Sequence, residues 1–417
     1  MLAAIDRELD DEAFAVVGVH SPKFPAQRDP QLVAAAVQRL GVTHPQILDP
    51  EMAITSSYGV RGWPTMVVVG PDGYVLATLP GEPEPQGLLL ALRQVLGQAR
   101  AQGLLNPRPL PLRPVSQAPH RFRFPGAVAA GAGRLFVADT GHNEVAALES
   151  DGADPERLGA GLLDHPNGMA VAGRTLYVAS TGDHSIRAVD LPTAAVTTVA
   201  GPPLRSPWGL AWDGRRLFIA NAGTHEIWTW DPATGHATPF AGIGVEGGRD
   251  GDAREALFAQ PSGLALMDGV LYVADAETSS IRAISDLDGT PRVRTVCGAG
   301  DLFGFGDRDG AGPGAELQHP IGLAAGDAVL YVADTFNHKI RRVDPVSGSC
   351  RTTFGGGGSE LDPDPYPGSV LAPAEPNRPA FLEPEGLAYR RGELIVADTG
   401  NHRVLAVRVE TGERRVL

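Results

Sequence analysis

The chain has 417 residues, 43% of them apolar, and its 52 glycines and 36 prolines are typical of many short strands joined by turns. Its net charge of −14 argues against nucleic acid or an anionic membrane surface as a main partner, because phosphate binding needs a basic footprint. Only two cysteines occur and no export signal or membrane-length apolar run is evident, so we expect a cytoplasmic protein without a disulfide framework, cofactor or resident metal.

The first 103 residues show an α/β pattern. It predicts strands at residues 15–20, 65–70 and 74–79, a turn at 71–73, and helices at 31–40 and 86–101. The residues before position 15 resemble the end of a helix. Residues 104–124 contain five prolines and no periodicity, which predicts a linker of restricted flexibility.

One strand motif then occurs six times. Its copies begin at Leu135, Leu176, Leu217, Leu271, Leu330 and Leu394, and each follows a motif proline (Pro125, Pro166, Pro207, Pro261, Pro320, Pro384) by ten residues. Fixed spacing inside the unit and variable spacing between units indicate a rigid module with loop insertions. Four strands per unit, with a second strand that is apolar on both faces, predict a mainly β protein: a six-bladed β-propeller over residues 125–417. The last unit has its own fourth strand near residues 412–417, so we expect closure without a swapped strand.

Two polar positions recur in every unit. The first is occupied by Asp139, Ser180, Asn221, Asp275, Asp334 and Asp398, the residue set whose side chains accept N–H groups two residues further on in turns. The second is occupied by His184, His225, His338 and His402, with Asn143 and Ser279 in the other units, and we expect it to tie neighbouring strands. Catalysis needs one residue in one place, so we interpret both positions as structural and metal binding by the histidines as the minor alternative.

Function in a ring of repeats is expected where equivalent positions differ, beside the motif prolines. His165 and His319 precede theirs in opposite blades and could share a metal only very near the axis. Trp208 follows its proline and joins the candidate binding residues. Glu383 and Glu385 are expected on one side of a strand, where they bind a cation or a basic group, or else line a solvated channel mouth, which we favour.

Three further features have structural explanations. Asp250-Gly-Asp252 and Asp307-Arg-Asp-Gly310 resemble calcium loops but lack the remaining regularly spaced ligands, so we interpret them as turns. Cys297 and Cys350 fall in the fourth strands of successive blades, where we expect buried or half-buried thiols that do not form a pair.

Leu330–Ile340 and residues 394–404 resemble the NHL repeat. Residues 60–65, Val-Arg-Gly-Trp-Pro-Thr, resemble the loop of a thioredoxin-like domain that carries a cis-proline, here Pro64, followed by a strand. The combination resembles the NHL-repeat-containing protein 2 family over nearly the whole chain. The resemblance implies a partial thioredoxin-like domain at 1–103, with Trp63, Pro64 and Thr65 beside a substrate groove. The alternative is that Trp63 anchors this domain on the propeller.

The chain departs from this resemblance at one point. The dithiol motif of a thioredoxin-like domain would lie ahead of Met1, and residues 1–296 contain no cysteine, so either the start lies upstream or the redox site has been lost. We therefore expect a monomeric binding or scaffold protein without catalytic residues in this chain, whose partner is a protein or peptide and neither nucleic acid nor a membrane. The alternatives are a thiol-disulfide redox protein and a metal-dependent lyase or hydrolase of the propeller type.

Overall fold

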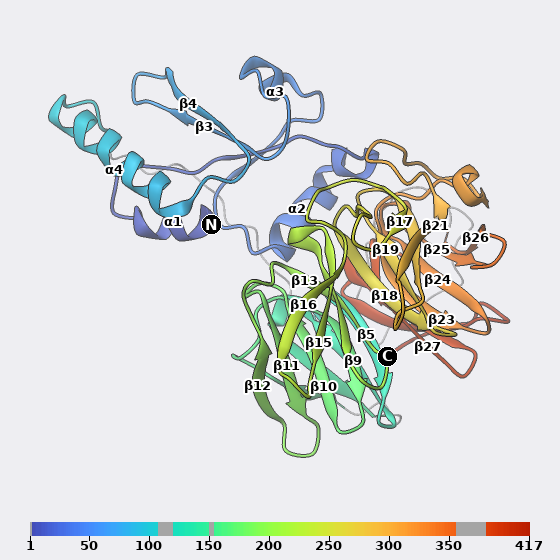
Figure 1. Ribbon diagram of the computed structural model, residues 1–417. Helices are drawn as coiled ribbons and strands as arrows, with labels where there is room; N and C mark the ends of the chain where they lie inside the picture. The colour runs from blue at the N-terminus through green and yellow to red at the C-terminus, as the bar shows by residue number, and fades with distance from the viewer. Residues whose placement is uncertain (1, 107–119, 150–153, 356–380) are drawn as a thin grey trace. The chain divides into compact units, whose positions relative to one another are not determined.

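The computed structural model describes residues 2–106, 120–149, 154–355 and 381–417 (Figure 1). Contacts divide the chain into two compact units, Met1–Ala118 and Pro119–Leu417. Residues 107–119, which make up much of the predicted linker, lie outside the described residues. No helix in the described part of the chain is long and apolar enough to cross a membrane.

The first unit combines short strands with helices. Its elements are α1 (Leu2–Glu8), β1 (Gly18–His20), η1 (Pro25–Arg28), α2 (Pro30–Arg39), β2 (Gln46–Leu48), α3 (Ala53–Ser57), β3 (Thr65–Val69), β4 (Val75–Pro80) and α4 (Pro85–Ala101). β1 pairs with β2 in parallel and β3 pairs with β4 antiparallel, as two separate two-stranded sheets. Carboxylates at the N-caps, Asp29 for α2 and Glu84 for α4, accept the first free N–H groups of these helices. Leucines of α4 pack against Ile5 of α1 and against Leu9, which follows this helix, to form the core of this unit.

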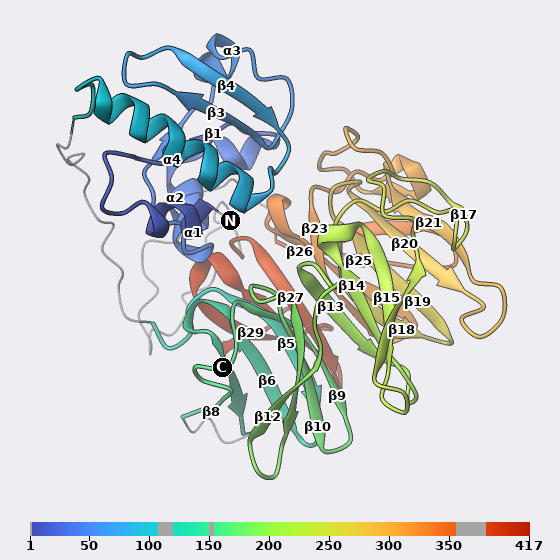
Figure 2. The ribbon, with the colours of Figure 1, turned by 60° about the vertical axis from the view of Figure 1, so that its left-hand side comes forward.

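The second unit contains six antiparallel sheets, and the predicted six-bladed β-propeller is confirmed (Figures 1 and 2). Blade 1 contains β5 (Pro125–Gly131), β6 (Arg134–Asp139), β7 (Glu144–Leu148) and β8 (Glu156–Leu158). Blade 2 contains β9 (Pro166–Ala172), β10 (Thr175–Ser180), β11 (Ser185–Asp190) and β12 (Ala195–Ala200). Blade 3 contains β13 (Pro207–Trp212), β14 (Leu217–Asn221), β15 (Glu226–Asp231) and β16 (His236–Ala241).

Blades 4 and 5 each carry one additional short strand from the insertion that precedes them. Blade 4 contains β17 (Gly251–Asp252), β18 (Pro261–Met267), β19 (Val270–Asp275), β20 (Ser280–Ser285) and β21 (Arg292–Gly298). Blade 5 contains β22 (Gly310–Ala311), β23 (Pro320–Gly326), β24 (Val329–Asp334), β25 (Lys339–Val343) and β26 (Ser349–Phe354). Blade 6 contains β27 (Pro384–Arg390), β28 (Glu393–Asp398), β29 (Arg403–Arg408) and β30 (Arg414–Val416).

The ring closes on its own strands. The first strand of each blade contacts the first strand of the next, and β27 of blade 6 contacts β5 of blade 1. The fourth strand of blade 6 is β30, which pairs with β29, so closure without a swapped strand is confirmed. Apolar clusters fill the spaces between successive blades, which explains why the second strands are apolar on both faces.

Candidate functional site

The first repeated polar position forms a hydrogen bond inside each blade. Its side-chain oxygen accepts the backbone N–H of the residue 16 positions earlier, at 2.7–2.9 Å, in all six blades. The prediction that these side chains accept an N–H two residues further on was wrong. The reason is that the first two strands of each blade form a hairpin, with a register shift beside the motif proline, as between Pro261 and Leu264. The hairpin brings the N–H that lies two residues before the motif proline next to the end of the second strand.

The second repeated position joins each blade to the next. Its side chain accepts the backbone N–H of the residue before the following motif proline, at 2.7–3.4 Å, at all six junctions. The acceptors are Asn143, His184, His225, Ser279, His338 and His402, and the donors are His165, Ser206, Gln260, His319, Glu383 and Phe124. All twelve residues have positive φ. The histidines therefore tie blades together through unprotonated Nδ1 atoms, and their role is architectural.

Arginine accompanies every aspartate at the first repeated position. The second carboxylate oxygen accepts Arg157 at Asp139, Arg282 at Asp275, Arg341 at Asp334 and Arg403 at Asp398, at 2.6–3.1 Å. Burial raises the pKa of Asp275 to about 6, although Arg282 acts to lower it. Sequence reasoning missed these pairs. The available signal was an arginine between apolar neighbours, as in Ile281-Arg282-Ala283.

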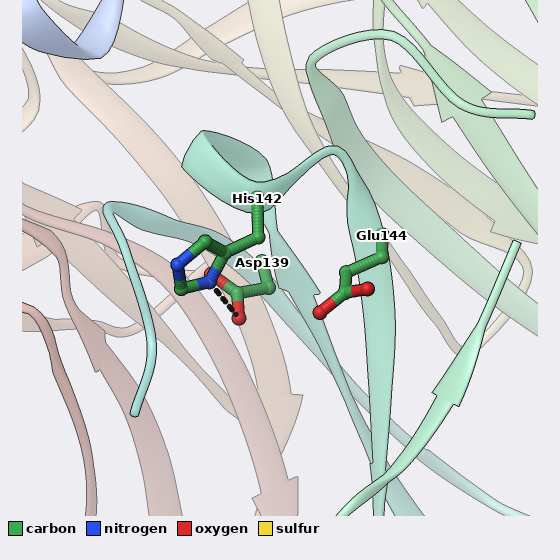
Figure 3. Close-up of side chains that lie close together, drawn as sticks. All are labelled: Asp139, His142 and Glu144. Atoms are coloured by element: carbon green, nitrogen blue, oxygen red, sulfur yellow. Dashed lines mark hydrogen bonds and ion pairs between the residues drawn. The ribbon is translucent and has the colours of Figure 1, made fainter. Parts of the chain in front are cut away.

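Asp139, His142 and Glu144 bring three possible metal-ligand atoms within 4.8 Å of one another (Figure 3). A cation already occupies this cluster, because Nη1 of Arg157 lies 2.6 Å from Asp139 and 2.9 Å from Glu144. His142 completes the group through Nδ1, 2.9 Å from the same oxygen of Asp139. The arrangement is that of an arginine-binding cluster and offers no free carboxylate pair to a metal.

The axis of the propeller holds a small cavity of about 80 Å³, lined by the six innermost strands. Trp208, Ile321 and Glu385 each come directly after a motif proline, and each is followed by a glycine. These three residues and their glycines line the cavity. At Gly322 a methyl group would overlap the carbonyl oxygen of Glu385 in the next blade. These glycines allow the inner strands to approach closely, and the cavity that they leave among the described residues is small.

His165 and His319 do not meet at the axis. Nδ1 of His165 lies 2.6 Å from Asp164, whereas His319 stacks on Phe336 with ring centroids 4.6 Å apart. Neither ring lines the axial cavity. Glu383 and Glu385, which were expected at a solvated channel mouth, are both buried. Glu385 lines the axial cavity, and Glu383 does not.

Two insertions form ordered loops ahead of blades 4 and 5. The buried guanidinium of Arg282 binds Asp250 at 2.7 Å and two backbone carbonyls, and that of Arg341 binds Asp307 at 2.5 Å and Asp309 at 2.7 Å. The carboxylates of these acidic turns therefore bind buried arginines. The sequence had led us to expect turns without such a role. The loops touch where Gly248 meets the backbone of Gly300.

Comparison with known proteins also identifies the repeat. A family model for the NHL repeat matches residues 381–406. The chain is 33% identical over 465 residues to NHL repeat-containing protein 2 of Homo sapiens, with 96% of this chain and 63% of the relative covered. It is 32% identical over 463 residues to Protein SUPPRESSOR OF QUENCHING 1, chloroplastic, of Arabidopsis thaliana, with 99% and 43% covered. The chain is an NHL-repeat β-propeller protein related to NHL repeat-containing protein 2.

The related proteins are longer, since this chain spans less than two thirds of either. Among solved structures, an auxiliary nutrient binding protein from Bacteroides thetaiotaomicron matches with a TM-score of 0.54 at 15% identity, over 68% of each chain. This likeness concerns the fold alone. The NHL propeller is thus defined by its repeat and its hydrogen bonds.

Outside the NHL propeller, the peptide bond between Trp63 and Pro64 is cis, as the resemblance implied. Trp63 is 55% exposed. Thr65 donates its hydroxyl to the carbonyl of Gly62 at 2.6 Å, and the carbonyl of Pro64 accepts the N–H of Gly81 at 2.8 Å. The loop that carries this exposed aromatic residue is therefore fixed by hydrogen bonds on both sides of it.

Proposed function

We propose that this NHL protein is a binding or scaffold protein whose propeller contacts a partner protein or peptide through the insertion loops ahead of blades 4 and 5. The observation that carries the proposal is an apolar surface on ordered loops. Ile243 and Val245 are 46% and 54% exposed on the first loop, and Phe303 is 84% exposed on the second. The carboxylate of Asp301 accepts the N–H groups of Phe303 and Gly304 and fixes the turn that carries the aromatic ring.

The chemistry of these loops favours a protein partner. Large exposed apolar side chains on a rigid support are typical of interaction sites, and aromatic anchors supply much of the binding energy in protein interfaces. A net charge of −14 argues against nucleic acid and anionic membranes. An enzyme of the lyase or hydrolase type would need several histidines or carboxylates converging on the axis. Among the described residues, the axial cavity is lined by the single carboxylate of Glu385, so we prefer binding.

The test is a comparison of partner capture. Immobilised protein is incubated with lysate of the source cells, and bound proteins are identified and quantified by mass spectrometry for the wild type, the double variant Val245→Ser/Phe303→Ser, and Val346→Ser. Val346 is 93% exposed on the turn between β25 and β26 and provides the matched control. We expect the double variant to lose at least one partner that both other proteins retain. Identical capture by all three proteins would contradict the assignment of the loops.

The first unit supplies a second proposed contact at Trp63, Pro64 and Thr65. Substitution of the exposed indole by Trp63→Ala tests it in the same capture experiment, and loss of a partner distinct from that of the loops would support a scaffold with two surfaces. We further propose a cytoplasmic location, because the chain carries only two cysteines and neither is in a disulfide. We also propose that the protein is a monomer. Light scattering on the purified protein tests the monomer.

A further inference from the structure

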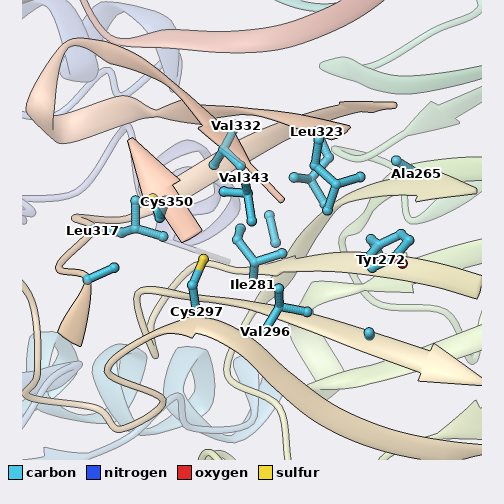
Figure 4. Close-up of a cluster of buried hydrophobic side chains, with 14 residues drawn as sticks. Ala265, Tyr272, Ile281, Val296, Cys297, Leu317, Leu323, Val332, Val343 and Cys350 are labelled. Carbon is cyan, nitrogen blue, oxygen red and sulfur yellow. The ribbon is translucent and has the colours of Figure 1, made fainter. Parts of the chain in front are cut away.

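The two cysteines of the propeller meet at the interface between blades 4 and 5 (Figure 4). Cys297 lies on β21 and pairs with Ile281, and Cys350 lies on β26 and pairs with Val343. Both side chains are fully buried in one apolar cluster. The expectation of buried thiols is confirmed, and neither cysteine is in a disulfide in the structure. Face-to-face packing of successive blades brings the fourth strands that carry them into one cluster.

We propose that Cys297 and Cys350 form a reversible disulfide between blades 4 and 5 when the protein is exposed to a hydroperoxide. The pair is a modification site and not a catalytic dithiol, since both sulfurs are buried among the described residues and are not accessible to a second protein substrate. This proposal is independent of the partner-binding function.

The backbones beside the two cysteines lie close enough for such a link. A Cβ atom at Gly348, two residues before Cys350, would lie 2.6 Å from the carbonyl oxygen of Val296. Arg294 donates from Nη2 to the carbonyl of Pro345 at 2.9 Å, which fastens the same two segments a few residues away. A disulfide needs Cα atoms about 4.4–6.8 Å apart, a separation that this close approach of the two backbones favours.

The chemistry balances with one equivalent of hydroperoxide. The first thiol attacks the peroxide, the O–O bond breaks, and the sulfur becomes a sulfenic acid while water or an alcohol leaves. The second thiol attacks that sulfur, the S–S bond forms, and the sulfenic hydroxyl leaves as water with the proton of the second thiol. The neighbouring Cys350 and burial raise the pKa of Cys297, so little thiolate is present at neutral pH and oxidation is slow until the interface opens.

The experiment uses the intact wild-type protein. It is treated with hydrogen peroxide at pH 7, quenched, denatured, alkylated and weighed, and the tryptic peptides at residues 295–308 and 343–351 are mapped. We expect a mass loss of two hydrogens, a linked pair of these peptides, reversal by dithiothreitol, and a thermal midpoint several degrees above that of the reduced protein. The midpoint should rise because a link between blades restricts the unfolded chain.

Cys350→Ala is the matched control, and it should show neither the linked peptides nor the rise of the midpoint. If this variant does not fold, the peptide map of the wild type alone decides. Two fully alkylatable thiols after peroxide treatment, or cysteines oxidised singly to sulfinic acid, would overturn the proposal.

Discussion

The stability of the protein should depend on pH through His402, which lies at the junction between blades 6 and 1. Its Nδ1 accepts the N–H of Phe124 at 3.2 Å, and its ring stacks on that of His120 with centroids 4.2 Å apart. Burial, with His120 and Arg123 adding to it, lowers the pKa of His402 from 6.5 to about 3. A protonated imidazole carries N–H groups on both nitrogens and cannot accept this bond. Between these pKa values the unfolded chain binds the proton and the folded chain does not, so stability falls as pH falls.

The size of the effect follows from the two pKa values. Linkage gives a loss of about 2 kcal/mol between pH 7 and pH 5, and at most about 5 kcal/mol below pH 3. Asp275 acts in the opposite direction, because its pKa of about 6 lies above its ordinary value, and the stability it contributes at low pH is lost as pH rises through 6. A variant at His402 leaves Asp275 in blade 4 unchanged, so the difference between wild type and variant isolates the histidine.

The informative variant is His402→Asn. Asparagine at the same repeat position, Asn143, accepts the N–H of His165 at 2.7 Å, so the acceptor is kept and the titrating group is removed. We expect the variant to be about 1 kcal/mol less stable at pH 7, because the aromatic stack is lost. From pH 7 to pH 5 it should lose about 2 kcal/mol less than the wild type. Urea unfolding at both pH values measures this, and equal losses in the two proteins would refute the reasoning.

Three further predictions concern the ring and its insertions. Arg341→Met should lower the free energy of unfolding by about 3–5 kcal/mol, because it leaves Asp334 buried without its cation, whereas Arg342→Met on the exposed face should change it by less than about 0.5 kcal/mol in the same urea titration. Gly322→Ala should cost about 1–3 kcal/mol or more through overlap with the next blade, while Gly201→Ala, where the space is open, should not, and equal midpoints would refute close packing at the axis. His402→Ala should be less stable than His402→Asn at pH 7 by about 1–3 kcal/mol, because the N–H of Phe124 loses its acceptor.

Spacing alone predicts the architecture because the repeat is local. The ten residues from each motif proline to the next strand form one hairpin, and their length determines where that hairpin turns. Pairing across the fold is not local. Asp334 binds the N–H of Gln318, 16 residues earlier, and this separation is the same in all six blades but becomes apparent only once the hairpin is known. His338 binds the N–H of Glu383 in the next blade, across a separation that varies with the insertion between the blades. The burial of Glu383 and Glu385 escapes prediction for the same reason, since it depends on the strands packed around them.

The alternation of Asp, Asn and Ser at the first repeated position has a physical explanation. A neutral Asn221 or Ser180 accepts the N–H of its blade at 2.8 or 2.9 Å, so the shared hydrogen bond does not require a charge. The carboxylate appears in the four blades where an arginine reaches its second oxygen, and not in blades 2 and 3. In blade 2 an arginine is present, but Arg187 pairs with Asp183 instead of with Ser180. A buried guanidinium that loses its carboxylate destabilises the fold. Substituting the aspartate and the arginine of one blade together should therefore lower the free energy of unfolding less than substituting either residue alone.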